Sequence, residues 1–426
     1  MDAQAIAELA SSSRLAVLTN VRLIDGLGGP PVDQSYVALR DGKILSVGAA
    51  SNAPATDLML DGAGMTLLPG LIDAHAHLIY SGFSSLEAID RCSIEMSTIN
   101  AVLNAERVLR AGYTTIRDVG TIANVAVSVR DAIAEGKVPG PTVVASGPIL
   151  CATASLGDTL PAHWQSSHGL GKLVDGPDEI RREIRLQIRA GVDNIKLAAS
   201  GVEVGPYAWT WMTTFSEEEI RVAVEEAHRW GRTVAVHAQS YDSVRFALRA
   251  GADTIEHGTR MDDETIALFK RSGAVLVPTL STLFSVLELG ASLNLLPKQR
   301  DEMKVNEPLW IDSLKRARAA GIPIASGADL GNRYPQGSNA REIALLVRVG
   351  FEPMEALCAA TSVAARALKR QDQIGSLEAG KRADLLLFDG DPLKDIESLQ
   401  DLSRIALVIK NGRGVAGSFC PTSRLQ

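Results

Sequence analysis

The feature that most constrains the fold is a repeated alternation of short apolar runs and amphipathic segments in the middle of the chain. Eight runs read as strands: LIDAHAHL, TTIRDVG, TVVASGPI, NIKLAAS, TVAVHAQ, TIEHG, VLVPTL and PIASGAD. Amphipathic stretches such as SEEEIRVAVEEAHRWG lie between them, and Ser216 followed by Glu219 is typical of a helix capping box. Eight strand–helix units predict an α/β protein whose core is a parallel (β/α)8 barrel of the TIM type.

The two ends of the chain have a different texture. Residues 14–66 contain short runs rich in Val, Leu and Ile that are broken by Gly, Asp and Pro, and the tail repeats this pattern in ADLLLFDGDP and IALVIKNGRGV. We therefore expect a small β-sandwich domain formed by residues 1–66 plus 372–426. Residues 67–371 would form the inserted barrel.

Charge and hydropathy exclude several classes of partner. The formal net charge is −7, whereas nucleic acid and anionic membranes both require a basic face. We see no apolar run long enough for a membrane span and no signal peptide. The four cysteines form no CxxC pair and read as free thiols of a reducing compartment. We expect a cytoplasmic homo-oligomer that acts on a small molecule, with no nucleic-acid or membrane partner.

Metal-ligand residue types gather at the predicted strand ends, which is where a TIM barrel carries its functional groups. His75 and His77 lie two positions apart, so both rings can face the barrel axis. Lys196 stands at an apolar strand position, where an ammonium without a partner costs free energy. One strand-end His is usually only a satisfied polar residue, a strand-end Asp often caps a helix, and a Lys can extend to the surface. The joint pattern nevertheless predicts a metal site formed by His75, His77, Lys196, His237, His257 and Asp329.

The motifs PGLIDAHAHL, NIKLAAS, VAVHAQS, TIEHGT and SGAD resemble the amidohydrolase superfamily, and within it the imidazolonepropionase-like and prolidase-like branch. The resemblance covers nearly the whole chain. It implies that His75, His77 and Asp329 hold one divalent metal and that His237 and His257 hold a second. It also implies a lysine carbamate at Lys196 that bridges the two ions. Zn²⁺ fits these ligands, with Mn²⁺ or Co²⁺ as alternatives. Asp329 would act as the general base toward a metal-activated water.

The chain departs from the prolidase-like pattern in the substrate pocket. Such enzymes usually carry GGHG after the third strand and a tyrosine two places after the fifth-strand His, and both bind the substrate carboxylate. Here the third-strand loop reads ILCATASLGDTLPAHW, and Gln239 stands at the tyrosine position. Tyr241 is displaced by two residues, and His163, His168 or Arg333 could substitute. Four aromatic residues of the third- and fourth-strand loops either pack those loops or line an apolar pocket: Trp164, Tyr207, Trp209 and Trp211.

These observations favour hydrolysis of an amide, carbamate or urea C–N bond in a largely apolar, aromatic small molecule. Relatives in this branch include ochratoxin-type amidases and hydrolases of phenylurea and thiocarbamate herbicides. The alternatives are an Xaa-Pro or Xaa-Arg/Lys dipeptidase and a cyclic-amide hydrolase of the imidazolone type. A catalytically inactive scaffold is a fourth possibility, which the complete ligand set disfavours.

Overall fold

The computed structural model describes residues 15–83, 85–161, 163–164, 169–289, 296–331 and 333–418. Within these residues the chain divides into two compact units. The first comprises residues 15–73, 106–115 and 337–418, and the second comprises residues 74–105 and 116–336. All the predicted metal-ligand residues belong to the second unit.

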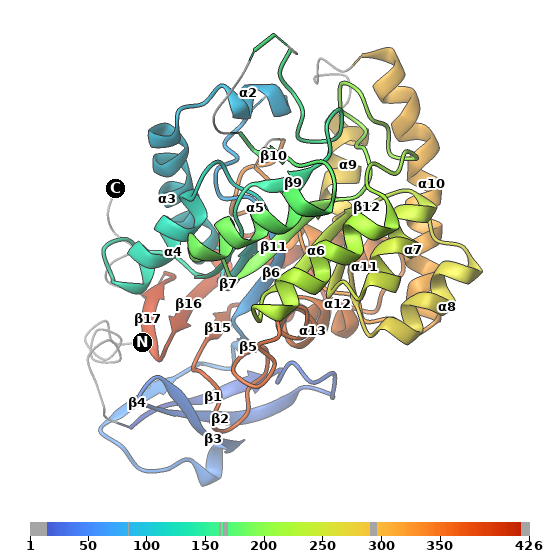
Figure 1. The fold of residues 1–426 in the computed structure, drawn as a ribbon. Helices are drawn as coiled ribbons and strands as arrows, with labels where there is room; N and C mark the ends of the chain where they lie inside the picture. The colour runs from blue at the N-terminus through green and yellow to red at the C-terminus, as the bar shows by residue number, and fades with distance from the viewer. Residues whose placement is uncertain are drawn as a thin grey trace. The chain divides into compact units, whose positions relative to one another are not determined.

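Both ends of the described chain contribute strands to one connected sheet in the first unit (Figure 1). The strand order is β17-β16-β15-β5-β1-β2-β3, and β4 pairs with β1. The strands are β1 (Ala16–Leu23), β2 (Val32–Arg40), β3 (Lys43–Ala49), β4 (Leu58–Asp61), β5 (Thr66–Pro69), β15 (Leu385–Phe388), β16 (Ile405–Lys410) and β17 (Arg413–Ala416). β5 and β15 pair antiparallel, so the beginning and the end of the described chain share one hydrophobic cluster. This confirms a separate sheet domain made from both ends.

The second unit has a TIM-barrel-like arrangement, although its first two strands begin in the first unit. Parallel pairing joins the strands in the order β6-β7-β8 and in the order β9-β11-β12-β13-β14, with β10 beside β9. The strands are β6 (Leu71–Ala76), β7 (Tyr113–Asp118), β8 (Thr142–Ala145), β9 (Ile149–Cys151), β10 (Gly171–Leu173), β11 (Asn194–Ala198), β12 (Thr233–Ala238), β13 (Thr254–His257) and β14 (Val275–Val277). A parallel bridge between Ser146 and Asn194 links the β8 end to β11.

Two of the eight predicted strands differ from expectation. The third run is divided into β8 and β9, because Pro148 separates the two pairing segments. The eighth run, residues 323–329, forms only an isolated bridge between Ile324 and Leu276. Residues 323–329 nevertheless form backbone hydrogen bonds with β14 on one side and with β6 on the other. Ala325 N donates to Leu276 O at 2.9 Å, and Ala74 N donates to Ser326 O at 2.9 Å.

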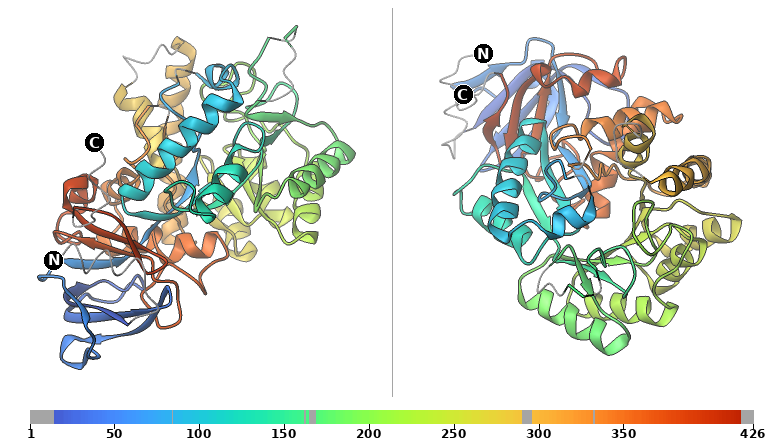
Figure 2. Two further views of the ribbon diagram at one scale, coloured as in Figure 1. Left: turned by 90° about the vertical axis from the view of Figure 1, so that its left-hand side faces the viewer. Right: turned by 90° about the horizontal axis from the view of Figure 1, so that it is seen from above.

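Helices of the second unit lie outside the strands (Figures 1 and 2). α6 packs on β12, and α7 packs on β12 and β13. The predicted capping box of Ser216 and Glu219 is confirmed at the start of α6. The helices of the two units are α2 (Leu86–Asp90), α3 (Ile94–Arg110), α4 (Val125–Ala134), α5 (Pro177–Arg189), α6 (Glu217–Arg229), α7 (Tyr241–Ala250), α8 (Asp263–Ser272), α9 (Leu280–Leu289), α10 (Pro297–Ala319), α11 (Ala340–Arg348), α12 (Pro353–Ala359) and α13 (Ser362–Ala367).

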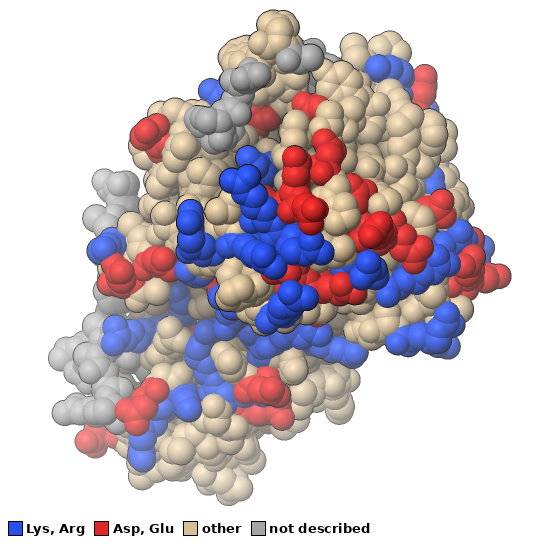
Figure 3. All heavy atoms as spheres, in the orientation of Figure 1, with Lys and Arg blue, Asp and Glu red and all other residues tan. Residues whose placement is uncertain are grey.

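Charges of both signs occupy the surface of the second unit. Four arginines of α5 line one shallow hollow, namely Arg181, Arg182, Arg185 and Arg189. Figure 3 shows acidic side chains beside the basic ones on this face, and Arg185 pairs with Glu226 of α6 at 2.7 Å. Among the described residues, no helix combines the length and the apolar character that crossing a bilayer requires.

Candidate metal centre

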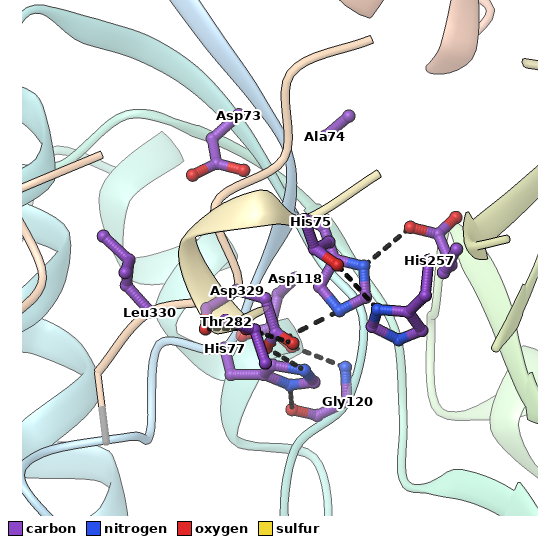
Figure 4. Close-up of polar contacts among 12 residues, drawn as sticks. Asp73, Ala74, His75, His77, Asp118, Gly120, His257, Thr282, Asp329 and Leu330 are labelled. Carbon is purple, nitrogen blue, oxygen red and sulfur yellow. Dashed lines mark hydrogen bonds and ion pairs between the residues drawn. The ribbon is translucent and has the colours of Figure 1, made fainter. Parts of the chain in front are cut away.

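Three predicted ligands meet at the carboxyl end of β6. The ligand atoms of His75, His77 and Asp329 all lie within 4.8 Å of one another, a spacing at which the three could hold one metal ion. Asp329 Oδ1 lies 3.7 Å from His75 Nε2 and 3.5 Å from His77 Nε2. Figure 4 shows the three side chains pointing toward one another. Asp329 N also donates to His75 O at 2.9 Å, which fixes the segment 323–329 against β6.

One ring nitrogen of each of the four histidines contacts a protein oxygen. The contacts are His75 Nδ1 to Glu256 Oε2 at 2.7 Å, His77 Nδ1 to Gly120 O at 2.8 Å, His237 Nε2 to Gly201 O at 2.9 Å and His257 Nδ1 to Thr279 Oγ1 at 2.6 Å. A contact of this kind fixes the tautomer and the orientation of a metal-binding imidazole. The second nitrogen of each ring therefore remains the one suited to coordination.

The four imidazoles are close together and electrically neutral. His237 and His257 lie with ring centroids 4.5 Å apart, and His75 and His257 with centroids 5.3 Å apart. Burial lowers the pKa of all four, and the nearby Lys196 lowers it further; the pKa of His237 falls to about 3. A neutral imidazole is the form that binds a metal ion.

Lys196 lies in β11, beside β12, which carries His237. It is 2% exposed, and its Nζ has no hydrogen-bond partner among the described residues. Burial lowers the pKa of Lys196 to about 8. An ammonium in this position is costly, whereas a lysine that reacts with CO2 and faces cations is not. The orphaned nitrogen therefore fits the group that the sequence implies.

A buried ion pair beneath the histidines was not predicted. Glu256 of β13 accepts from Arg117 of β7 at 2.8 Å, and both side chains are 0% exposed. The other carboxylate oxygen of Glu256 is the one that contacts His75 Nδ1. Arg117 also donates to Ala74 O at 2.7 Å. Charged residues inside the runs TTIRDVG and TIEHG were the signal available in the sequence, because a buried charge needs a partner.

Asp118 joins the ends of β6 and β7. Its carboxylate accepts from Leu78 N at 2.9 Å and from Gly120 N at 3.1 Å. Gly120 O in turn contacts His77 Nδ1 (Figure 4). Burial raises the pKa of Asp118 to about 7, although the two backbone bonds oppose the shift. Asp118 thus helps to position His77 through the backbone of Gly120.

Asp329 remains the ionised partner in this centre. Burial alone raises its pKa, but His75, His77 and the hydroxyl of Thr282 outweigh that effect, and the net pKa lies below the ordinary value. The hydrogen bond from Thr282 Oγ1 to Asp329 Oδ2 measures 3.0 Å and favours the ionised carboxylate. A carboxylate held in this way can bind a cation and accept a proton.

A pocket opens onto the ligand side chains. Its walls are largely apolar and include Tyr80, Leu86, Ile149, Leu156, Val202, Val204 and Leu330. Polar groups also reach it, namely Glu203, Gln239, Thr282, Ser285, Arg333 and Tyr334. All six predicted metal-ligand residues line this same pocket. Of the candidate substrate-binding residues that the structure describes, Gln239 and Arg333 are found in this wall.

The other tentative substrate residues that the structure describes do not line this pocket. Trp164, Tyr207 and Trp211 are 46%, 48% and 57% exposed, and the Arg91 guanidinium lies 4.4 Å from the Trp164 ring centroid. Trp209 is partly buried, and the Lys298 ammonium lies 5.0 Å from the centroid of its ring. His163 is exposed, Tyr241 is 40% exposed, and His168 lies outside the described residues. A contact between these side chains and substrate stays a prediction.

Comparison with known proteins gives one family and several similar enzymes. The model of the amidohydrolase family matches residues 66–415. The ochratoxinase of Aspergillus niger is 30% identical over 417 residues, which covers 90% of this chain and 83% of that protein. A crystal structure of A. niger ochratoxinase aligns with a TM-score of 0.86 at 28% identity and covers 96% of this chain and 98% of the other.

Two further matches differ in their named activity. The crystal structure of an Xaa-Pro dipeptidase with bound methionine aligns with a TM-score of 0.85 at 29% identity, covering 94% of this chain and 99% of that one. An imidazolonepropionase from a Geobacillus species is 26% identical over 430 residues, covering 91% of this chain and 92% of that protein. The similar proteins therefore agree on the family and differ in their substrates.

Proposed function

The chain belongs to the amidohydrolase family, whose members are metal-dependent hydrolases of C–N bonds, and we propose that it cleaves an amide, carbamate or urea bond in a largely apolar, aromatic small molecule. The observation that carries the proposal is the single pocket in which His75, His77 and Asp329 face apolar walls. Removing an apolar substrate from water into such a pocket gains roughly 25 cal/mol per Å² of buried surface. A relative named ochratoxinase supports a substrate other than a peptide.

The residues of this centre are suited to two divalent ions. We assign His75, His77 and Asp329 to one ion, His237 and His257 to the other, and a carbamate on Lys196 to both, with zinc as the preferred metal. Bound metal would polarise the scissile carbonyl and acidify a water molecule. Asp329 would then take the proton from water at its carboxylate and pass it to the leaving nitrogen. Thr282 and the backbone bond to His75 O hold Asp329 in place for both tasks.

The finer features of the fold belong to the same proposal. We infer that residues 67–371 form a closed (β/α)8 hydrolase domain, supported by the backbone bonds of residues 323–329 to β14 and β6. We also infer that residues 1–66 plus 372–426 form a β-sandwich domain, supported by the shared hydrophobic cluster of both chain ends. A homo-oligomeric state and a cytoplasmic location stay predictions from the sequence.

A dipeptidase is the second candidate, and one observation favours it. The Arg333 guanidinium lies in the pocket wall and donates to Ser285 Oγ at 3.3 Å. A partly buried cation of this kind could receive the carboxylate of an Xaa-Pro, Xaa-Arg or Xaa-Lys dipeptide. The similarity to an Xaa-Pro dipeptidase supports this candidate. The similarity to imidazolonepropionase supports a cyclic-amide substrate as a third.

The test is a paired substrate panel on protein of measured metal content. We expect about two divalent ions per chain and higher kcat/KM on neutral aryl amides, carbamates or ureas than on any dipeptide. Asp329→Asn should keep the fold while losing at least ~100-fold in rate, the usual weight of a general base. A dipeptide that outperforms every neutral compound would establish the second candidate. Activity that persists without bound metal would refute the metal-dependent proposal altogether.

A further inference from the structure

The wall of the pocket contains a buried acid for which the proposed hydrolysis has no use. Glu203 follows β11, is 3% exposed and lines the pocket together with Val202 and Val204. Its Oε1 has no hydrogen-bond partner in the part of the chain that the structure describes. A buried carboxylate oxygen without a donor is costly, and such groups in proteins usually have a partner. This oxygen is therefore available to a donor that enters the pocket.

Gln239 turns a donor toward the same carboxylate. The hydroxyl of Thr259 donates to Gln239 Oε1 at 3.0 Å, which leaves the amide nitrogen of Gln239 to donate to Glu203. Gln239 N is held by Ser200 Oγ at 2.9 Å. Gln239 thus orients the Glu203 carboxylate but leaves Oε1 of Glu203 without a donor.

The segment that carries Glu203 is fixed by its own backbone. Gly201 N donates to Met212 O at 3.2 Å, and Val202 N donates to Ala208 O at 3.3 Å. A Cβ at Gly201 would lie 2.3 Å from the backbone of Ala208, so only glycine permits this approach. A rigid support of this kind gives a polar group in a binding site its precision.

Two further charged groups act on Glu203 electrostatically without a hydrogen bond to its Oε1. Arg333 is close enough to favour the carboxylate electrostatically, and Glu302 disfavours it. Burial is the larger effect and raises the pKa of Glu203 to about 7. Arg333 itself donates to Ser285 Oγ and does not bond to Oε1 of Glu203. A donor supplied by a ligand would offset the burial of this carboxylate.

We propose that Glu203 is a specificity-determining residue whose Oε1 accepts a hydrogen bond from an amino group of the substrate. The preferred substrates are then amide-type molecules with an apolar body that carries an amino substituent, rather than wholly apolar ones. This inference rests on the proposed function for the position of the scissile bond. It assigns the recognition of a second substrate group to the loop after β11.

The test compares acetanilides that carry either an amino or a methyl group at each ring position. These substituents are similar in size, so the ratio of their kcat/KM values isolates hydrogen bonding. We expect the wild type to prefer the best amino compound by roughly tenfold or more. Glu203→Leu should bring the ratio to about one, because Leu cannot accept a hydrogen bond. Glu203→Gln, which can still accept, should give an intermediate ratio. The matched control Glu218→Leu alters an exposed acid of α6 and should keep the wild-type ratio.

A binding measurement separates this inference from the proposed reaction. Titration calorimetry of the metal-loaded protein with phenylenediamines and toluidines reports the same preference without hydrolysis. We expect the diamine to bind more tightly to the wild type and equally to Glu203→Leu. Equal binding to the wild type, no saturable binding of either series, or a preference that survives Glu203→Leu would each overturn the role of Glu203. If the preference is seen but no C–N compound is hydrolysed, the proposed reaction fails while the binding role of Glu203 stands.

Discussion

Three residues of the pocket region take up left-handed backbone conformations at strand ends. His257, Thr279 and Asp329 have φ values of 70°, 50° and 49°, which residues other than glycine seldom adopt. In a regular strand, neighbouring side chains point to opposite faces. The turn at His257 instead lets Glu256 and His257 both contact His75. Backbone strain of this kind is typical of functional sites, where the surrounding structure holds it in place.

At the residue scale, replacing Lys196 should stabilise the metal-free protein but impair metal binding and activity. Lys196→Met removes a buried nitrogen that has no hydrogen-bond partner. In chelator-treated protein we therefore expect the free energy of unfolding to rise by roughly 1–3 kcal/mol. The same variant should take up less metal and lose most activity, with partial rescue by short-chain acids. Urea unfolding and elemental analysis measure the two effects.

The control for this experiment is Lys172→Met, which replaces an exposed lysine of β10 and should change neither quantity appreciably. A Lys196→Met protein with a normal metal content would remove Lys196 from the ligand set. A destabilised metal-free variant would show that the ammonium has a favourable interaction in the folded protein.

At the element scale, β7 and β13 are joined beneath the metal centre by Arg117 and Glu256. The Thr254 hydroxyl donates to the same carboxylate, and Arg117 also reaches Thr254 at 2.9 Å. The opposite charges of Arg117 and Glu256 balance each other in the interior. The Glu256 carboxylate also fixes the orientation of the His75 ring. Glu256 is therefore a positioning residue that acts through His75, and its effect on metal binding can be separated from its effect on stability.

Glu256→Gln should lower both stability and metal affinity. The change leaves the Arg117 guanidinium buried without a counter-charge, which typically lowers the free energy of unfolding by about 3 kcal/mol. Weaker orientation of His75 should reduce metal affinity by roughly 10- to 100-fold. Urea unfolding of metal-free protein and competition with a chromophoric chelator measure the two quantities. Glu225→Gln, which breaks the exposed pair with Arg221, should have a much smaller effect on both.

Much of this architecture could be predicted from strand and helix patterns. The alternation of apolar runs predicted β6, β7, β11, β12, β13 and β14, because a buried parallel strand requires a continuous apolar run. The run PIASGAD was less predictable, because Gly327 packs against His75 and Val277, where a Cβ would lie 2.4 Å from a Val277 methyl group. Close approach of that kind follows from tertiary packing. Residues 323–329 therefore form an isolated bridge to β14 in place of a regular strand ladder.

The same limit applies to the site. The predicted ligand set stood out in the sequence because His and Lys are unusual at strand ends, and the structure brings His75, His77 and Asp329 of that set together. Gln239 was visible because it lies two positions after His237, where the resembling enzymes carry a tyrosine, and it follows directly after the end of β12. The placement of the His257 ring beside His75 depends on the left-handed turn at His257, and the position of Glu203 depends on the folding of the loop after β11. Neither follows from a period of two.

For the whole molecule, metal binding and folding must be linked if the ligands come together only in the folded chain. His75 and Asp329 are separated by most of the second unit in sequence, and the unfolded chain does not hold them at ligand spacing. An ion that binds only the folded state stabilises it by RT ln(1 + [L]/Kd). Above the Kd, each tenfold rise in free metal therefore adds about 1.4 kcal/mol for every ion bound.

The slope of the free energy of unfolding against the logarithm of free Zn²⁺ should thus report the number of bound ions. On the proposal of two bound ions, we expect the free energy of unfolding, measured in metal-buffered urea titrations, to rise by about 2.8 kcal/mol per tenfold increase in free Zn²⁺. His237→Ala should reduce this slope to that of one ion, because His75, His77 and Asp329 remain together. A one-ion slope in the wild type would mean a mononuclear centre. Lys196 would then have only one cation to face, and a bridging carbamate would have no role.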